Sequence, residues 1–335
     1  MGNLGRRPSP RPTPSPPSRN TTLGDLLHRA VELLERLARR ILVRIAAEDI
    51  VLADETPVPV QAPGKVRRAY VWAFLGAVLI GFRYSASRSG LTPVSVLGSS
   101  AGTLVVDGYT GYKQARAARI LGAPIAAGAV VPAQAPDKRE RSGCLAHVRR
   151  KFADARGTEA VAANRALDLI LSVYRVEHEA KALRCVRNDD HLKLRQEKSA
   201  PAMQAFKDWL ATERSKHLPS GPVGKAISSA VNQWQFLTAF LHDARIPVDN
   251  NASERALRTY ALRRKNLLFV GNDVAGEHLA VLMSLVRSCE AAGVNPKVSI
   301  TDMLMRVQTH PMARIDELLP DACKPATHLA PIDSG

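Results

Sequence analysis

The chain is 335 residues long, 45% hydrophobic and 23% charged, which is typical of a soluble globular protein with one large or two small domains. Its 47 Lys and Arg residues outnumber 31 Asp and Glu residues, and the formal net charge of +16 favours a polyanionic partner because each neutralised phosphate releases counterions. No apolar run is long enough to span a bilayer, and the N-terminus lacks the apolar region of a secretory signal. Four widely separated cysteines argue against a disulfide framework and indicate a cytoplasmic protein.

The N-terminal part of the chain predicts a tail followed by a helix. Residues 1–21 are rich in Pro, Ser and Arg and cannot bury a core, so we expect a disordered segment that is either a solvated tail or a DNA-binding arm. In residues 22–48, apolar side chains recur at helical spacing after Thr22, which is a suitable N-cap. We therefore expect one amphipathic helix before the first strand.

Strand-like segments dominate residues 49–143. They are Ile50–Ala53, Ala69–Leu75, Val78–Tyr84 and Thr103–Val106. A Pro-containing turn is expected after Asp54, and the second and third segments predict a hairpin closed near Gly76. A short helix over about 110–120 and an apolar piece near 125–131 complete the predicted α/β region.

The second half of the chain is mainly helical. Residues 144–245 lose the alternation of a strand and carry apolar side chains at helical spacing, which predicts an all-helical insertion. Mixed structure returns in residues 246–320, where a helix is expected after Asn250, a residue of the N-cap type. The further elements predicted there are a strand-like piece at Leu267–Val270 and helices over about 277–292 and 300–309. Residues 321–335 are expected to be a flexible tail.

Three carboxylates in this arrangement are candidates for metal chemistry. Asp54 and Asp107 each end an apolar run, where an ionised carboxylate is costly unless a metal ion or an Arg side chain meets it. Glu254 lies in the first turn of a predicted helix, where it could equally well serve the helix dipole. Each acid alone has a structural explanation. Together they describe a hard oxygen-ligand site for Mg²⁺, in which two ions would activate the attacking oxygen and stabilise the leaving one.

Two neighbouring acids compete for places in this site. Glu55 adjoins Asp54, but neighbours in a strand point to opposite faces, so only one of them can join the site, and Asp54 is preferred. Asp249 could replace Glu254, but it precedes the expected helix start and suits a cap better.

Several uncharged or weakly charged residues beside the acids have two interpretations. His147 is expected to be a structural hydrogen-bonding residue, with positioning of a phosphate as the alternative. Asn250 and Asn251 would cap the helix or orient Glu254. Tyr109 and Tyr112 are expected to be packing residues, with base stacking as the alternative.

Seven short strings along the chain resemble those of one protein family, the transposases of the insertion-sequence-66 type. The strings occur in that family's order between about Leu26 and Leu319, and they are ADETPVPV, FRYSASRSG, LVVDGYTGYK, CLAHVRRKF, IPVDNNASERALR, RRKNLLFVG and DELLP. Seven separated motifs in one order make the resemblance far more specific than any single motif does.

The resemblance implies a DDE-type transposase with an α/β fold. Its RNase-H-like (retroviral-integrase-like) core would be interrupted by the large all-helical insertion and flanked by N- and C-terminal helices. The family's catalytic and metal-binding triad falls on Asp54, Asp107 and Glu254. The implied cofactor is Mg²⁺, for which Mn²⁺ is expected to substitute. The implied partners are DNA, as transposon ends and as target, further copies of the chain assembled on that DNA, and accessory proteins of the same element.

Basic residues cluster around these motifs and are candidates for contacts with DNA phosphates. They are Arg149, Arg150, Lys151, Arg255, Arg258, Arg263, Arg264 and Lys265. The alternative interpretation is that they form solvated faces of helices.

The sequence departs from the family's pattern at its N-terminal end. Family members carry a cysteine-rich, zinc-finger-like segment and an end-recognition region there, whereas no cysteine precedes Cys144 in this chain. We therefore also consider a truncated, catalytically inactive remnant that binds DNA non-specifically. A different RNase-H-like nuclease, which would cleave without joining, is disfavoured by the order of the motifs.

Overall fold

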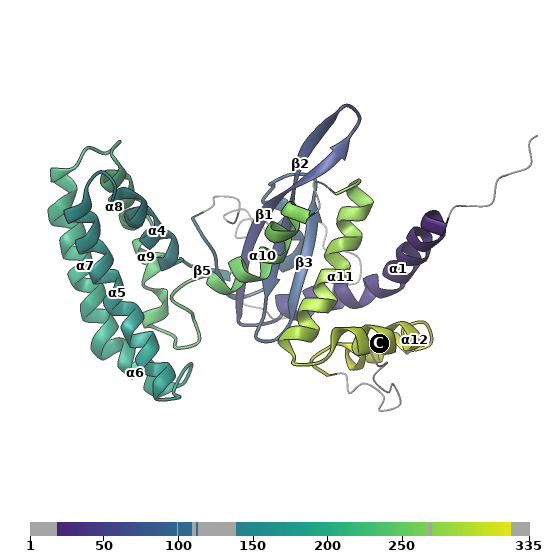
Figure 1. Cartoon of the computed structure of the whole chain (residues 1–335). Coiled ribbons are helices and arrows are strands. Elements are labelled where there is room, and N and C mark those ends of the chain that lie inside the picture. Colours follow the sequence, from purple (N-terminus) through teal and green to yellow (C-terminus); the bar gives the residue numbers. More distant parts are fainter. Residues whose placement is uncertain (1–18, 99, 109–111, 113–138, 267–269, 323–335) are drawn as a thin grey trace, which may run out of the picture.

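The computed structural model (Figure 1) describes the chain except for residues 1–18, 99, 109–111, 113–138, 267–269 and 323–335. The helix predicted over about 110–120 and the apolar piece near 125–131 lie outside the described residues, as do most of the two predicted tails. The first described helix, α1, spans Arg19–Ala46 and corresponds to the helix predicted in residues 22–48.

A mixed five-stranded sheet in the order β3–β2–β1–β4–β5 forms the centre of the described chain. Its strands are β1 (Ile50–Ala62), β2 (Lys65–Leu75), β3 (Ile80–Ser85), β4 (Gly102–Val105) and β5 (Arg139–Ser142). The first three are antiparallel neighbours, whereas β4 and β5 run parallel to β1. The predicted hairpin closes at Gly76, whose backbone N donates to the carbonyl O of Leu79 (3.0 Å). The prediction of an α/β fold is therefore confirmed.

The prediction of a turn after Asp54 is wrong, because β1 continues through two prolines. The backbone N of Gln61 donates to the carbonyl O of Val270, away from β2 (2.9 Å). Pro57, Pro59 and Gln61 are alternate residues of β1, and alternate residues direct their backbone N positions to the same side of a strand. The two prolines therefore lack an N–H group on the side that faces away from β2. On that side, β4 pairs only with the first three residues of β1. Positions 57 and 59 therefore have no strand of the described sheet there to which they would donate, and proline is tolerated.

Strand β5 was not predicted, because its sequence, Arg-Glu-Arg-Ser, is entirely polar. The buried side chain of Arg139 compensates for this polarity. Its guanidinium donates to the carbonyl O atoms of Ala46 (2.8 Å) and Glu48 (2.7 Å) and to Oγ of Ser100 (2.9 Å). A polar residue with this many partners can occupy a strand next to the core.

Helices cover both faces of the sheet. On one face, Ile41 of α1 packs in a core with Trp72, and on the other, Leu257 packs in a core with Val71. The helices of this part, besides α1, are α2 (Leu91–Leu97), α10 (Asn251–Asn266), α11 (Asp273–Ala291), α12 (Pro296–Arg306) and the 3₁₀ segment η5 (Met312–Leu318). The helices predicted after Asn250, over about 277–292 and over about 300–309 correspond to α10, α11 and α12. Of the predicted strand-like piece Leu267–Val270, only Val270 is described, and it forms a bridge with Val60.

A helical lobe separates β5 from α10 and lies beside the sheet, on the left of Figure 1. It lies in the segment for which the sequence predicts a helical insertion, and it has a core of its own that includes Phe152, Ile170, Phe206 and Ile227. Its elements are α4 (Leu145–Ala155), α5 (Ala160–Ala182), α6 (Asp189–Leu194), the π-helix η2 (Arg195–Ser199), α7 (Ala200–Glu213), η3 (Arg214–Lys216), α8 (Pro222–Asn232), α9 (Trp234–Leu237) and η4 (Ala239–Leu241). Within the described ranges, none of the helices combines the length and apolar character that a membrane span requires.

A buried ion pair fixes the segment that leads from the lobe back to the sheet. The side chain of Arg195 is 1% exposed, and its Nε and Nη2 atoms donate to the two carboxylate oxygens of Glu177, each at 2.8 Å. Its Nη1 donates to the carbonyl O atoms of Phe240 (3.0 Å) and Ile246 (2.9 Å), among others in this segment. The charge of Arg195 is therefore fully compensated, and the return segment is held in one position.

Candidate active site

Asp54 lies in β1 on the face of the sheet that α10 covers. Its register partner in β2 is Ala73, which belongs to the same core as Ala256 and Leu257 of α10. Register partners in an antiparallel ladder present their side chains on the same face of the sheet. Asp54 therefore faces the helix whose first turn contains Glu254.

Glu55 lies on the opposite face and has partners of its own. Nε of Arg88 donates to Oε1 of Glu55 (2.8 Å), and the hydroxyl of Tyr112 donates to Oε2 (2.7 Å). The Glu55 side chain is only 1% exposed, and burial raises its pKa even though both donors lower it. Tyr112 packs edge-on against Trp72, as expected of a packing residue, whereas Tyr109 lies outside the described residues.

Negative charge accumulates around Asp54. Burial, the largest cause, and repulsion by Glu55, Asp107 and Glu254 together raise the pKa of Asp54 to about 7. A hydrogen bond from the backbone N of Glu55 to Oδ1 (2.9 Å) acts in the opposite direction. Three carboxylates that are far apart in the sequence thus act on one another electrostatically, which is typical of cation sites and of catalytic sites.

Asn250 ties the start of α10 to β1. Its fully buried side chain donates from Nδ2 to the carbonyl O of Ala53 (2.7 Å), and its Oδ1 accepts a hydrogen bond from Oγ of Ser253 (2.6 Å). The first contact is made directly before Asp54 and the second directly before Glu254. Asn250 therefore fixes the position of the helix turn that carries Glu254 relative to the strand that carries Asp54.

Asp249 points away from this group and serves the helix start. Its Oδ1 accepts a hydrogen bond from the backbone N of Asn251 (3.1 Å), and its Oδ2 accepts one from the hydroxyl of Tyr174 in α5 (3.0 Å). This is the capping arrangement that the sequence predicts for Asp249.

Glu254 lies between the sheet and the helical lobe. Nη2 of Arg150 donates to its Oε2 (3.0 Å), and Nε2 of His147 is 3.7 Å from its Oε1. Oε1 of Glu254 and Nδ1 of His147 are buried atoms without a hydrogen-bond partner among the described residues. Both partners of Glu254 belong to α4, the first helix of the lobe, so the lobe contributes directly to the surroundings of the acid.

Asp107 follows β4, and its backbone is connected to the lobe by Arg141. Nη2 of Arg141 donates to the carbonyl O of Asp107 (2.6 Å) and to Oε1 of Gln233 (3.0 Å). The guanidinium also lies over the ring of Phe236, 4.6 Å from its centre. Sequence reasoning missed Arg141 and Gln233, because neither residue belongs to a motif that signals chemistry, and Arg141 is one of several charged residues in the run 137–141.

The three acids do not form a closed set of metal ligands. In the part of the chain that the structure describes, no group of three His, Cys, Asp or Glu side chains is arranged so that it could hold a metal ion. Asp54, Asp107 and Glu254 thus share an electrostatic field, while Glu254 is engaged by Arg150.

The predicted DNA-contacting residues differ in their surroundings. Arg149, Arg255 and Arg258 are exposed, and Arg150 is exposed but paired with Glu254. Lys151 is also exposed, and its Nζ donates to Oγ of Ser229 (2.7 Å). The other three lie in α10, where their side chains are outside the described part, and they are Arg263, Arg264 and Lys265.

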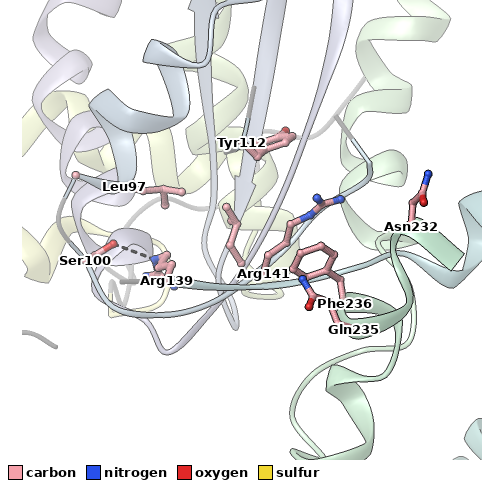
Figure 2. Close-up of a pocket in the computed structure, with 10 residues that line it drawn as sticks. Leu97, Ser100, Tyr112, Arg139, Arg141, Asn232, Gln235 and Phe236 are labelled. Atoms are coloured by element: carbon pink, nitrogen blue, oxygen red, sulfur yellow. Dashed lines mark hydrogen bonds between the residues drawn. The ribbon is translucent and has the colours of Figure 1, made fainter. Parts of the chain in front are cut away.

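A cavity of about 460 Å³ lies at the edge of the sheet, beside Arg141 (Figure 2). Its described lining includes Leu97, Tyr112, Arg139 and Phe236. Both arginines at this cavity are engaged in hydrogen bonds to carbonyl groups, and Figure 2 shows the bond from Arg139 to Ser100. The cavity adjoins the backbone of Asp107 through Arg141 and Glu55 through Tyr112, but none of the three acids belongs to its described lining.

Comparison with known proteins gives one family. The family model described as "Transposase IS66 family" matches residues 18–278. Among similar proteins of Sinorhizobium fredii (strain NBRC 101917 / NGR234), y4jD is 34% identical over 298 residues, covering 85% of this chain and 55% of that protein. The protein y4hP is 28% identical over 322 residues, covering 90% of this chain and 55% of that protein. Both are named as uncharacterized, and the chain spans about half of their length.

Proposed function

The chain belongs to the IS66 family of transposases, and from this premise we propose that it is the catalytic part of a DDE transposase that cleaves transposon ends and joins them to target DNA. The observation that carries the proposal is the electrostatic coupling of Asp54 with Asp107 and Glu254. The strand order, interrupted by a helical lobe after β5, is compatible with an RNase-H-like core. Because the chain spans about half the length of its relatives, the activity of the whole protein is part of the proposal.

The chemistry of the three acids, rather than their present arrangement, suits Mg²⁺. Carboxylate oxygens are the hard ligands that this ion prefers, and a divalent cation would relieve the repulsion that raises the pKa of Asp54. Bound Mg²⁺, or Mn²⁺ in its place, would activate the attacking oxygen and neutralise charge at the phosphate that is transferred. Asp54 and Asp107 would hold it from neighbouring parallel strands, and Glu254 would hold it from α10.

The remaining residues of the site would orient these groups and the DNA. Asn250 keeps the first turn of α10 against β1, so that Glu254 stays close to Asp54. Arg150 would leave Glu254 when a cation binds there and would then be free to donate to a phosphate oxygen of the DNA. No covalent enzyme–DNA intermediate is required, so no Ser, Tyr or Cys nucleophile is assigned.

The net charge of +16 supports DNA as the partner. Exposed Arg149, Arg255 and Arg258 would contact phosphates near the acids. We expect further copies of the chain to assemble on paired transposon ends, and we expect accessory proteins of the same element to take part.

The test is a strand-transfer assay with a pre-cleaved transposon end, a plasmid target and Mg²⁺ or Mn²⁺. Asp107→Ala should abolish the joined product while the fold and DNA binding are retained, because it removes a proposed ligand at a position beyond the end of β4. Asp168→Ala is the matched control, since Asp168 is an exposed acid of α5 in the helical lobe. Metal-dependent joining by the Asp107→Ala variant would refute the assignment of the acids.

The alternative function is that of an inactive remnant that binds DNA non-specifically. The pairing of Glu254 with Arg150 favours this alternative. The same assay distinguishes the two, because a folded, DNA-binding natural chain that gives no product in either metal would support the remnant.

A further inference from the structure

An open groove on the helical lobe begins next to Asp107. It has a volume of about 920 Å³ and runs along α4 and α8. The lining residues on which the inference depends are Gly108, Arg141, Lys151, Asp154, Lys225 and Gln233. Gly108 directly follows Asp107, and Arg141 donates to the carbonyl O of Asp107, so one end of the groove adjoins the proposed catalytic site.

The groove carries positive charge that the described protein leaves without a carboxylate partner. Lys225 is exposed and forms no ion pair with a described side chain, and the ammonium of Lys151 donates only to the hydroxyl of Ser229 there. Arg141 adds a third positive charge at the end near Asp107, and Asp154 is the acid in the described lining. The net charge of these groove side chains is therefore positive.

Some lysines elsewhere in the lobe differ in this respect. Lys193 pairs with Asp190, Lys198 with Glu179 and Lys216 with Glu213. The groove, by contrast, brings Lys151 and Lys225 close to Asp107, and neither of them pairs with a described carboxylate. A concentration of unpaired cations in a groove favours binding of a polyanion, because binding releases the counterions that the polyanion has condensed.

The shape of the groove favours one strand over a duplex. It lies between two helices that pack against each other, and the axes of packed helices are about 8–10 Å apart. A duplex, whose major groove alone is about 12 Å wide, is broader than a groove between packed helices and would contact only its rim, whereas an extended single strand can lie along it. The amide of Gln233 and the ring of Phe236 lie at the end near Asp107, where they can contact bases of an extended strand.

We propose that this groove binds the single-stranded nucleic acid that leaves the reacting phosphate at Asp107, with Lys151 and Lys225 contacting its phosphates. The proposal rests on the proposed transposase function, and it assigns to the lobe a substrate-binding role in addition to its contacts with Glu254. Binding can be measured without catalysis, so the two proposals can fail separately.

The experiment compares a blunt DNA duplex with the same duplex carrying a single-stranded extension of about ten nucleotides. This length is within the range that single-strand-binding folds usually cover. Fluorescence anisotropy gives the affinity of the natural chain and of the double variant Lys151→Ala/Lys225→Ala for both. The matched control is Lys193→Ala/Lys198→Ala, which removes two paired lysines from another part of the lobe. Thermal unfolding verifies that all three proteins are folded.

The natural chain should bind the extended duplex more tightly than the blunt one. The groove variant should lose about 25-fold in affinity for the extended duplex at about 0.1 M salt, and its slope of log affinity against log salt should decrease in size by about 1.4, because each phosphate contact with a single strand contributes about 0.7. Its affinity for the blunt duplex, and the affinities of the control, should change by less than about twofold.

Three outcomes would overturn the proposal: no gain in affinity from the extension, an equal loss on both DNAs, or an equal loss in the control. A strand-transfer assay on the same proteins separates the two proposals. Failure to join DNA despite a groove-dependent preference for the extension would overturn the transposase function alone, and joining without that preference would overturn only the groove.

Discussion

The sheet and the helical lobe both bury charged side chains, but they treat them in opposite ways. In the lobe, Arg195 meets the carboxylate of Glu177 and several carbonyl groups, so its charge has a complete set of partners. At the sheet, Asp54 is buried among further acids, and their repulsion adds to the burial that raises its pKa. The compensated charge of Arg195 holds the fold together, whereas the repulsion around Asp54 lowers stability and favours the binding of a cation.

This difference separates structural charge from functional charge without reference to motifs. A buried ion whose hydrogen bonds are all made has no capacity left for a ligand. A buried acid that is repelled by other acids is stabilised when a cation binds beside it. The comparison predicts opposite effects on stability when the two kinds of charge are removed.

Removal of the compensated charge should have the largest effect on stability. Arg195→Met leaves the Glu177 carboxylate buried without its main partner and frees the return segment, so the free energy of unfolding should decrease by about 3–5 kcal/mol. Chemical denaturation measures this loss. Arg165→Met is the control, because Arg165 is exposed on α5 and should change stability by less than about 0.5 kcal/mol. A loss below about 1 kcal/mol for Arg195→Met would mean that the ion pair does not hold the lobe together.

Removal of the repelled charge should have the opposite sign. The pKa of Asp54 is about 7 in the folded chain and about 3.9 in an unfolded one, so the folded state binds more protons and stability decreases as the pH rises from about 4 to 7. Asp54→Asn should therefore leave stability almost unchanged at pH 4 and raise it by about 2–4 kcal/mol at pH 8.

The measurement is the free energy of unfolding against pH in the presence of a chelator, with Asp168→Asn as the control. If Asp54→Asn were no more stable than the natural chain at pH 8, the acids would not repel one another as described. Added Mn²⁺ should stabilise the natural chain at pH 8 but have little effect on the Asp54→Asn variant.

Part of this comparison could be predicted from the sequence. The lobe and the strands with apolar side chains follow from their periodicity. Asp54 and Asp107 can be identified because they follow apolar runs, and Glu254 because it lies in the first turn of a predicted helix. The continuation of β1 was missed because proline normally signals a turn. It is tolerated here only because pairing with β4 ends early, which is a property of the whole sheet.

Contacts between distant segments were beyond the reach of local patterns. Arg150 was predicted to contact DNA, but in the structure it pairs with Glu254, 104 positions further along the chain. Strand β5 was missed because the burial of Arg139 is compensated by carbonyl groups from other segments. In each case a polar residue gains its role from a partner that only the tertiary fold supplies.

The Arg150–Glu254 pair gives the smallest effect on stability and the most direct test of how the lobe acts on the acids. Arg150 is 57% exposed, so Arg150→Ala should change the free energy of unfolding by less than about 1 kcal/mol. If Arg150 competes with a cation for the carboxylate of Glu254, the same variant should bind Mn²⁺ about three- to tenfold more tightly. The paramagnetic resonance signal of free Mn²⁺ measures this binding. Arg149→Ala removes the same charge from the neighbouring exposed position and should leave Mn²⁺ binding unchanged within about twofold. Weaker binding by Arg150→Ala would instead mean that Arg150 holds Glu254 ready for the metal, and the lobe would then assist the site rather than restrain it.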